Sequence, residues 1–421
     1  MGRPVALVER RGLGVMGHRN VLPAQIVNQK EHHMAGPRSL AGLGERRRNQ
    51  QKRQQWQMEK PMHDPTLRGE VRHCSSQTSQ TREFLPARTV PPRYPAPRDL
   101  PMPIETIGKP GSLVRRLRPS TLEEDALLVA QELSAPIADL WPYSPRFFEI
   151  ENALLHFVDE GPRDAPVLLC VHGNPTWSFM WRKMIEQFSG SFRVIALDHM
   201  GMGLSERPHD WNQTLSSHRT ALEMLINHLD LNHITLCVHD WGGAIGLGAA
   251  ANCTERIERL VITNTCVWSE AKLPAVLGLA HLPGIGPFLT GSLGLMTRGL
   301  ASLCTTNGLS QEVEAGFLAP YLSGERRRGI AAFVRDIPRG PSDKSYEALA
   351  AVDAGLALLR DKPTQILWGM QDWVFTPEIL RGFRERLPRA QVTILQDAGH
   401  LPLEDSPEEC LQAVQDFLSR T

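Results

Sequence analysis

A short segment at positions 234–247, ITLCVHDWGGAIGL, carries the residue best suited to covalent chemistry. Its first half is apolar and β-branched and predicts a buried parallel strand, while its second half is rich in small residues and predicts a helix. A strand that turns sharply into a helix is typical of a nucleophile elbow, which lifts one side chain above the carboxyl edge of a sheet. The side chain at this turn is Asp240.

Asp240 occupies the position that carries serine in the usual elbow pattern. A serine hydroxyl needs a base to remove its proton, whereas a carboxylate is ionised at neutral pH and can attack directly. An ionised aspartate is suited to displacing a leaving group from an alkyl carbon, which leaves an alkyl ester on the enzyme. The alternative is a structural role, in which Asp240 only caps the helix that follows it.

His400 lies in the segment DAGHLPLED, just after the last strand-like run of the chain. A histidine on this loop fits the chain order nucleophile, acid, histidine. Because Asp240 needs no deprotonation, we expect His400 to act as a base on the water molecule that attacks the ester.

Asp372, in the segment LWGMQDWVF, is the predicted acid that orients the ring of His400. Aspartate is also favoured in turns, so the position alone does not require this role. Glu270, which follows an earlier strand-like run, competes with Asp372 as the acid. Asp397 and Asp405 lie nearby, but Asp397 is too close to His400 in sequence to orient its ring easily.

The segment HGNPTWS at 172–178 follows the first predicted parallel strand. We expect the backbone N–H of Asn174 to join that of Trp241 in an oxyanion hole for the tetrahedral intermediate of ester hydrolysis. The side chains of Asn174 and Trp241 also carry N–H donors. Two neutral donors in an apolar pocket suit a departing halide or a developing oxyanion.

Strand-like and helix-like segments alternate along the second half of the chain. This alternation predicts an α/β fold with a mostly parallel sheet and helices on both faces. A short helix at 121–133 and a β-hairpin-like pair at 147–161 come first. The predicted strands are 165–173, 191–201, 234–238, 259–265, 363–369 and 391–399, with helices at 214–229 and 407–420.

Almost a hundred residues between the strands at 259–265 and 363–369 have helical character and no clear strand. An insertion at the carboxyl edge of the sheet predicts a cap at 267–345 that excludes water and lines an apolar pocket. The alternative is a helical insertion that only packs or dimerises.

The predicted core comprises 140–266 and 346–421, and the residues before it have a different composition. Basic residues are concentrated in the first hundred positions, although the 46 basic and 46 acidic residues of the chain balance. Residues 1–115 are rich in Arg, Gln, Pro and Ser and are predicted to be a disordered extension, followed by a linker at 116–139 with a short helix. We expect a solvated tail and no nucleic-acid partner.

Seven cysteines without metal-ligand spacing predict free thiols in a reducing compartment, and hence a cytoplasmic location. No apolar run is long enough to span a membrane. The sequence has no phosphate-binding glycine loop after the first strand and no His/Cys cluster, so we predict no cofactor and no metal. The oligomeric state is left open.

The segments HGNPTWSFMWR, LDHMGMGLSERP, VHDWGG, LWGMQDWVF and DAGHLPLED resemble those of the haloalkane dehalogenase family of α/β-hydrolases over residues 140–420. The resemblance implies Asp240 as nucleophile, His400 as base, Asp372 as acid, and Asn174 with Trp241 as the halide-stabilising pair. The position of the acid after the cap resembles the third subfamily, which includes olefin β-lactone decarboxylases. A small apolar substrate is therefore expected.

Four functions remain open at this stage. A dehalogenase-like hydrolase is the main interpretation, and a β-lactone decarboxylase uses the same residues. An epoxide hydrolase shares the elbow but usually needs two cap tyrosines, for which only Tyr321 and Tyr346 lie in or near the cap. The fourth function is a non-catalytic receptor or scaffold of the same fold, which the three competent residues of the triad disfavour.

Overall fold

A computed structural model of the chain describes residues 121–269, 274, 288 and 294–420. The predicted extension at 1–115 and the competing acid Glu270 lie outside these residues. The first described element is α2 (Thr121–Ser134), which confirms the helix predicted at 121–133, and a 3-10 turn, η1 (Ala135–Ile137), follows it.

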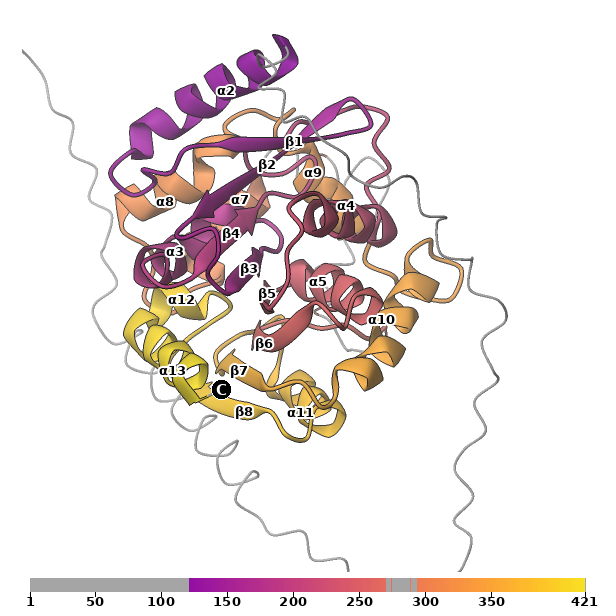
Figure 1. The fold of residues 1–421 in the computed structure, drawn as a ribbon. Helices are drawn as coiled ribbons and strands as arrows, with labels where there is room; N and C mark the ends of the chain where they lie inside the picture. The colour runs from indigo at the N-terminus through magenta and orange to yellow at the C-terminus, as the bar shows by residue number, and fades with distance from the viewer. Residues whose placement is uncertain (1–120, 270–273, 275–287, 289–293, 421) are drawn as a thin grey trace, which may run out of the picture. The chain divides into compact units, whose positions relative to one another are not determined.

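Eight strands in the described part of the chain form one sheet, with the order β1-β2-β4-β3-β5-β6-β7-β8 (Figure 1). β1 and β2 form the predicted antiparallel pair, and β2 also runs antiparallel to β4. All other neighbours are parallel, which confirms the predicted mostly parallel sheet. The strands are β1 Arg146–Ile150, β2 Ala153–Glu160, β3 Val167–Val171, β4 Arg193–Leu197, β5 Ile234–His239, β6 Ile257–Thr263, β7 Thr364–Gly369 and β8 Gln391–Leu395.

Helices cover both faces of this sheet (Figure 1). One face carries α4, α5, α10 and α11, and the other carries α3 and α13 with the short α12. The central strands β3, β5 and β7 are buried along their whole length, and they are apolar (β3) or mostly apolar (β5 and β7) instead of half polar. The helices are α3 Arg182–Phe188, α4 Leu215–His228, α5 Trp241–Asn252, α10 Tyr346–Leu359, α11 Pro377–Arg386, α12 Pro402–Asp405 and α13 Pro407–Arg420.

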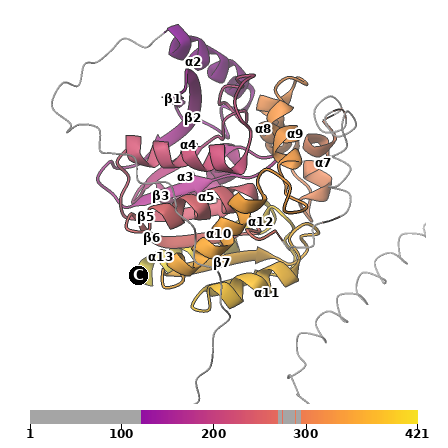
Figure 2. The ribbon, with the colours of Figure 1, turned by 90° about the vertical axis from the view of Figure 1, so that its right-hand side faces the viewer.

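The predicted helical cap lies between β6 and β7 in sequence. Its described helices α7, α8 and α9 gather at one end of the strands (Figure 2). Three hydrogen bonds tie it to the loop after β3, in which Trp177, Asn174 and Thr176 contact Gly316, Ile330 and Tyr321. The cap elements are α7 Leu295–Leu303, α8 Gln311–Leu318, η5 Ala319–Tyr321 and α9 Arg328–Arg335. The exact limits of the cap and core stay predictions.

None of the helices in the described part of the chain has the length and apolar character needed to cross a bilayer.

Candidate active site

Asp240 stands at the turn between β5 and α5, where the sequence predicts an elbow. Its backbone has φ of 50° and ψ of −127°, a left-handed conformation that favours glycine and costs free energy for other residues. Two contacts hold it there. The Asp240 N–H donates to the carbonyl of Asn264 at 3.0 Å, and the Thr265 hydroxyl donates to the carbonyl of Asp240. The Asp240 side chain makes no hydrogen bond to the first turn of α5, so the side-chain helix cap does not form.

Two glycines allow the backbone to approach this turn closely. A Cβ atom on Gly173 would lie 2.3 Å from Oδ1 of Asp240, and one on Gly242 would lie 2.2 Å from the carbonyl oxygen of Val171. Because real Cβ atoms do not come this near to other atoms, both positions require glycine. The loop after β3 can therefore lie directly against the Asp240 carboxylate.

The Asp240 carboxylate has its two oxygens in different surroundings. Oδ1 accepts a hydrogen bond of 2.6 Å from the backbone N–H of Asn174, and the nearby backbone N–H of Trp241 also favours the charged form of the carboxylate. Oδ2 lies 3.8 Å from Nε2 of His400. The structure thus brings together the two backbone donors predicted for an oxyanion hole.

His400 and Asp372 form a direct pair beside this carboxylate. Nδ1 of His400 lies 2.9 Å from Oδ2 of Asp372, and both residues are buried. A carboxylate can only accept, so Nδ1 carries the proton, and Nε2 is left as an acceptor facing Asp240. This is the tautomer that a base on water needs.

Asn264, which sequence analysis missed, fixes the position of Asp372. Its side-chain amide donates to Oδ2 of Asp372 at 2.9 Å and to the carbonyl of Gly369, while its Oδ1 accepts from the Gly369 N–H. The backbone N–H groups of Val374 and Phe375 donate to the other oxygen of Asp372. The sequence signal that could have identified Asn264 is its position as a polar residue directly after the buried strand β6.

Burial and neighbouring charges act in opposite directions on the two titrating groups nearest the reaction centre. Burial raises the pKa of Asp240, and the facing His400 with the backbone N–H groups of Asn174 and Trp241 opposes this rise. Burial alone would lower the pKa of His400, but the carboxylates of Asp372 and Asp240 outweigh it and raise that pKa. Esterification of Asp240 would remove one of these two negative charges.

The side chains of Asn174 and Trp241 both have donor capacity left. Nδ2 of Asn174 donates one proton to the carbonyl of Ile330 at 3.3 Å, and an amide nitrogen has two protons. Nε1 of Trp241 has no hydrogen-bond partner among the described residues, and the Trp241 ring packs edge-on against Phe333 of α9, with the ring centroids 5.9 Å apart. The cap helix therefore contacts both predicted halide donors.

The competing acids occupy other places. Asp397 is exposed, and its carbonyl accepts from the Thr306 hydroxyl. Asp405 accepts from the backbone N–H groups of Gly399 and Thr306, and so ties the His400 loop to the segment after α7.

The positions of the two tyrosines considered for epoxide chemistry differ from that of a hydroxyl group that donates a proton to a substrate in an open pocket. The Tyr321 hydroxyl donates to the carbonyl of Thr176 at 2.9 Å and accepts from the N–H of Gly203 at 3.0 Å, and the side chain is 2% exposed. Tyr346 is the first residue of α10, which packs against α5 on the face of the sheet.

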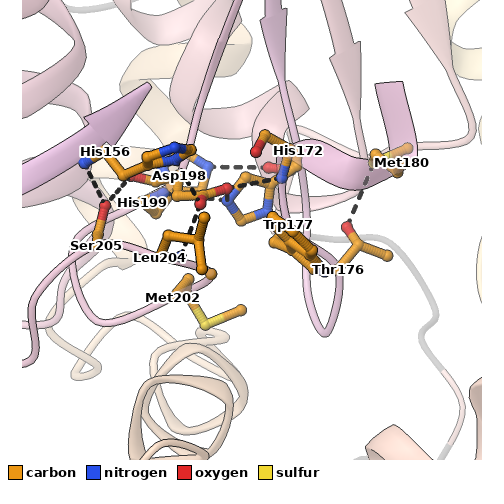
Figure 3. A network of polar contacts seen from close by, with 12 residues as sticks. His156, His172, Thr176, Trp177, Met180, Asp198, His199, Met202, Leu204 and Ser205 are labelled. Carbon is orange, nitrogen blue, oxygen red and sulfur yellow. Dashed lines mark hydrogen bonds and ion pairs between the residues drawn. The ribbon is translucent and has the colours of Figure 1, made fainter. Parts of the chain in front are cut away.

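A polar network around Asp198 supports the loop that carries Asn174 (Figure 3). The Asp198 carboxylate accepts from the N–H of Ser178 at 2.7 Å and from the ring of His156 at 2.9 Å. Nε2 of His172 accepts from the N–H of His199, and Nδ1 of His172 lies 2.8 Å from the carbonyl of Gly173. The segment 198–208 thus anchors the start of the loop and has no contact with the reacting groups.

Known proteins with similar sequences identify the class of protein to which this chain belongs. Residues 166–283 and 307–407 match a family described as the alpha/beta hydrolase fold. A cis-3-alkyl-4-alkyloxetan-2-one decarboxylase of Xanthomonas campestris pv. campestris is 33% identical over 66% of this chain and 97% of that protein. Haloalkane dehalogenase 2 of Mycobacterium tuberculosis is 31% identical over 66% of this chain and 96% of that protein.

A solved structure shows the same fold. The crystal structure of haloalkane dehalogenase DbeA from Bradyrhizobium elkani has a TM-score of 0.60 and 24% identity, and the match covers 66% of this chain and 99% of that one. The chain therefore belongs to the α/β-hydrolase family. Within it, the chain is an enzyme of the haloalkane dehalogenase-like group, which confirms the resemblance read from the sequence.

Proposed function

We propose that this enzyme displaces halide from a small apolar haloalkane in two steps, through an alkyl ester on Asp240. The observation that carries the proposal is the arrangement of the Asp240 carboxylate. One oxygen accepts a hydrogen bond from the backbone N–H of Asn174, and the other faces Nε2 of His400, whose Nδ1 is hydrogen-bonded to Asp372. A nucleophile, a base and an orienting acid in this relation are what ester formation and hydrolysis need.

In the first step, Oδ2 of Asp240 attacks the carbon that bears the halogen. The carbon–oxygen bond forms as the carbon–halogen bond breaks, and the halide leaves with both bonding electrons. The free N–H groups of Asn174 and Trp241 stabilise the departing anion. Oδ1 stays in its contact with the backbone N–H of Asn174.

In the second step, His400 takes a proton from a water molecule whose oxygen attacks the carboxyl carbon of the ester. The charge that develops on Oδ1 is stabilised by the backbone N–H groups of Asn174 and Trp241. Collapse of the intermediate releases the alcohol, which receives the proton from His400. Water is thus consumed, and the products are alcohol, halide and one proton.

A second function rests on the same residues and on the decarboxylase relatives. In it, Asp240 opens a β-lactone ring, and carbon dioxide and an alkene leave. The wild-type enzyme should be incubated separately with a 1-bromoalkane and a cis-3-alkyl-4-alkyloxetan-2-one, with the Asp240→Asn protein as a blank. Bromide and alcohol in equal amounts are expected. Alkene and carbon dioxide from the lactone, without bromide release, would transfer the assignment to the decarboxylase.

The two steps should depend on pH through different groups. Ester formation needs ionised Asp240, so its rate should fall at acidic pH around a pKa raised by burial. Ester hydrolysis needs neutral His400, so its rate should rise with pH and then level off. Because the ester lacks the Asp240 charge, this pKa should be lower than that of His400 in the free enzyme.

Rapid-quench measurements of halide release and alcohol release across the pH range separate the pH dependence of ester formation from that of ester hydrolysis. In the His400→Gln protein, the rate of halide release should still fall at acidic pH. A hydrolysis rate that increases as the pH falls would contradict the role of His400 as a base.

We also place the enzyme in the cytoplasm. The six described cysteines are all free, and burial raises the pKa of Cys266 and Cys410 to about 12, which keeps these thiols protonated and unreactive. Free thiols of this kind suit a reducing compartment.

A further inference from the structure

A cleft lies on the side of α9 that faces away from the catalytic residues. It is a cleft of about 510 Å³, which is within the size range of small-molecule sites. The loop after β4 and the start of α4 form one wall, and α9 with the segment before α10 forms the other. None of Asp240, His400, Asp372, Asn174 and Trp241 lines it.

The lining of this cleft is strongly basic. It contains Arg207, Arg328, Arg335 and Lys344 against a single acidic residue, Asp336. The Asp336 carboxylate is already engaged, because it accepts from the N–H of Leu215 and from the Ser345 hydroxyl. It therefore holds α9 against α4 and α10 and leaves most of the positive charge uncompensated.

The cations differ in how free they are to bind a ligand. Arg207 donates to the carbonyls of Gly203, Ser205 and Arg326 and is part of the wall. Arg335 and Lys344 are exposed, and neither side chain forms a hydrogen bond or ion pair with another described residue. Arg328 donates to a ring nitrogen of His209 at 2.7 Å and to the carbonyl of Arg207 at 3.1 Å, and the remaining N–H groups of its guanidinium have no such partner among these contacts.

Two of these charges are set apart along α9. Arg328 and Arg335 are seven residues apart, and a rise of 1.5 Å per residue separates their Cα atoms by about 10 Å. Two long side chains that start this far apart can each contact a different phosphate group of a diphosphate. Trp211 adds a partly buried ring to the lining, and its Nε1 is buried with no hydrogen-bond partner. A base can stack on such a ring.

We propose that this cleft binds a small molecule with two or more linked phosphate groups. Its phosphates would be contacted by Arg328, Arg335 and Lys344. Arginine pairs with phosphate through two parallel hydrogen bonds, and lysine adds a point charge. The phosphates come either from free pyrophosphate or from a nucleoside diphosphate that also uses Trp211. Ligand binding to this cleft can be measured without substrate turnover, so its test does not depend on the proposed reaction.

α9 connects this cleft to the catalytic residues. Arg328, Ala332 and Arg335 face the cleft, while Ile330 and Phe333 contact Asn174 and Trp241. A ligand that holds the first face therefore also fixes the position of the second.

The test is isothermal titration of the full-length protein with pyrophosphate, ADP and adenosine at fixed salt. Pyrophosphate and ADP are expected to bind at one site, and adenosine is not. The double variant Arg335→Gln/Lys344→Gln should weaken binding at least about 10-fold, since it removes two charge-assisted contacts. The charge-conserving Arg335→Lys/Lys344→Arg protein should retain most of the affinity.

The matched control is Arg381→Gln/Arg384→Gln on the exposed face of α11, which loses the same charge outside the cleft. It should bind like the wild type. Equal affinity for pyrophosphate and ADP would identify the phosphates as the whole ligand, and tighter binding of ADP would add the ring. No binding of either probe, or binding that Arg335→Gln/Lys344→Gln leaves unchanged, would overturn the proposal.

Discussion

Replacing Asp240 with asparagine should abolish turnover of haloalkane and lactone alike. The amide keeps the shape of the side chain but has no charge with which to displace a leaving group. Loss of a covalent nucleophile removes the whole reaction path, so we expect a fall in kcat of at least about 10³-fold. Steady-state release of halide and of carbon dioxide measures this effect.

A suitable control is Asp397→Asn, because this exposed aspartate lies near His400 in sequence and forms no hydrogen bond with its ring. It should retain wild-type activity, and thermal unfolding should show that both proteins are folded. Substantial activity in folded Asp240→Asn would mean that Asp240 serves only the turn between β5 and α5.

Replacing His400 with glutamine should separate the two chemical steps. Asp240 needs no base, so the first turnover should still release one equivalent of halide per enzyme. The ester then has no group to activate water, and steady-state turnover should fall by at least about 10³-fold. A rapid-quench time course of halide release is expected to show a burst followed by an almost flat phase.

The burst distinguishes this account from simple misfolding. A misfolded protein gives neither burst nor turnover, and its thermal transition is lost. If folded His400→Gln releases no halide at all, His400 is needed before the ester forms, and the proposed order of steps is wrong.

The fold could be predicted to a large extent because buried parallel strands leave a simple signal. β3 is apolar along its whole length and β5 mostly so, and the glycines after Asp240 mark the turn. The helix at Pro407–Arg420 could be read from its proline start and its period. Strand ends were less accurate, and predicted limits such as 191–201 exceed the observed Arg193–Leu197, since the ends of β4 are set by its pairing with the five residues of β3.

The candidate site was predictable where chemistry and chain order restrict the choice. The sequence placed Asp240, Asp372 and His400 in an order that the structure brings into contact. Asn264 was missed because its role depends on which strands are neighbours. β6 pairs with β7, and this pairing sets Asn264 beside Gly369 and Asp372. The basic cleft was likewise hidden, since its walls are more than a hundred residues apart in sequence.

The most direct test of the covalent role of Asp240 is to locate the ester. His400→Gln protein should be quenched at the end of the burst with a bromoalkane, digested, and examined by tandem mass spectrometry. The account predicts one alkyl group, on the side chain of Asp240. An alkyl group on another residue, or a halide burst with unmodified protein, would contradict it.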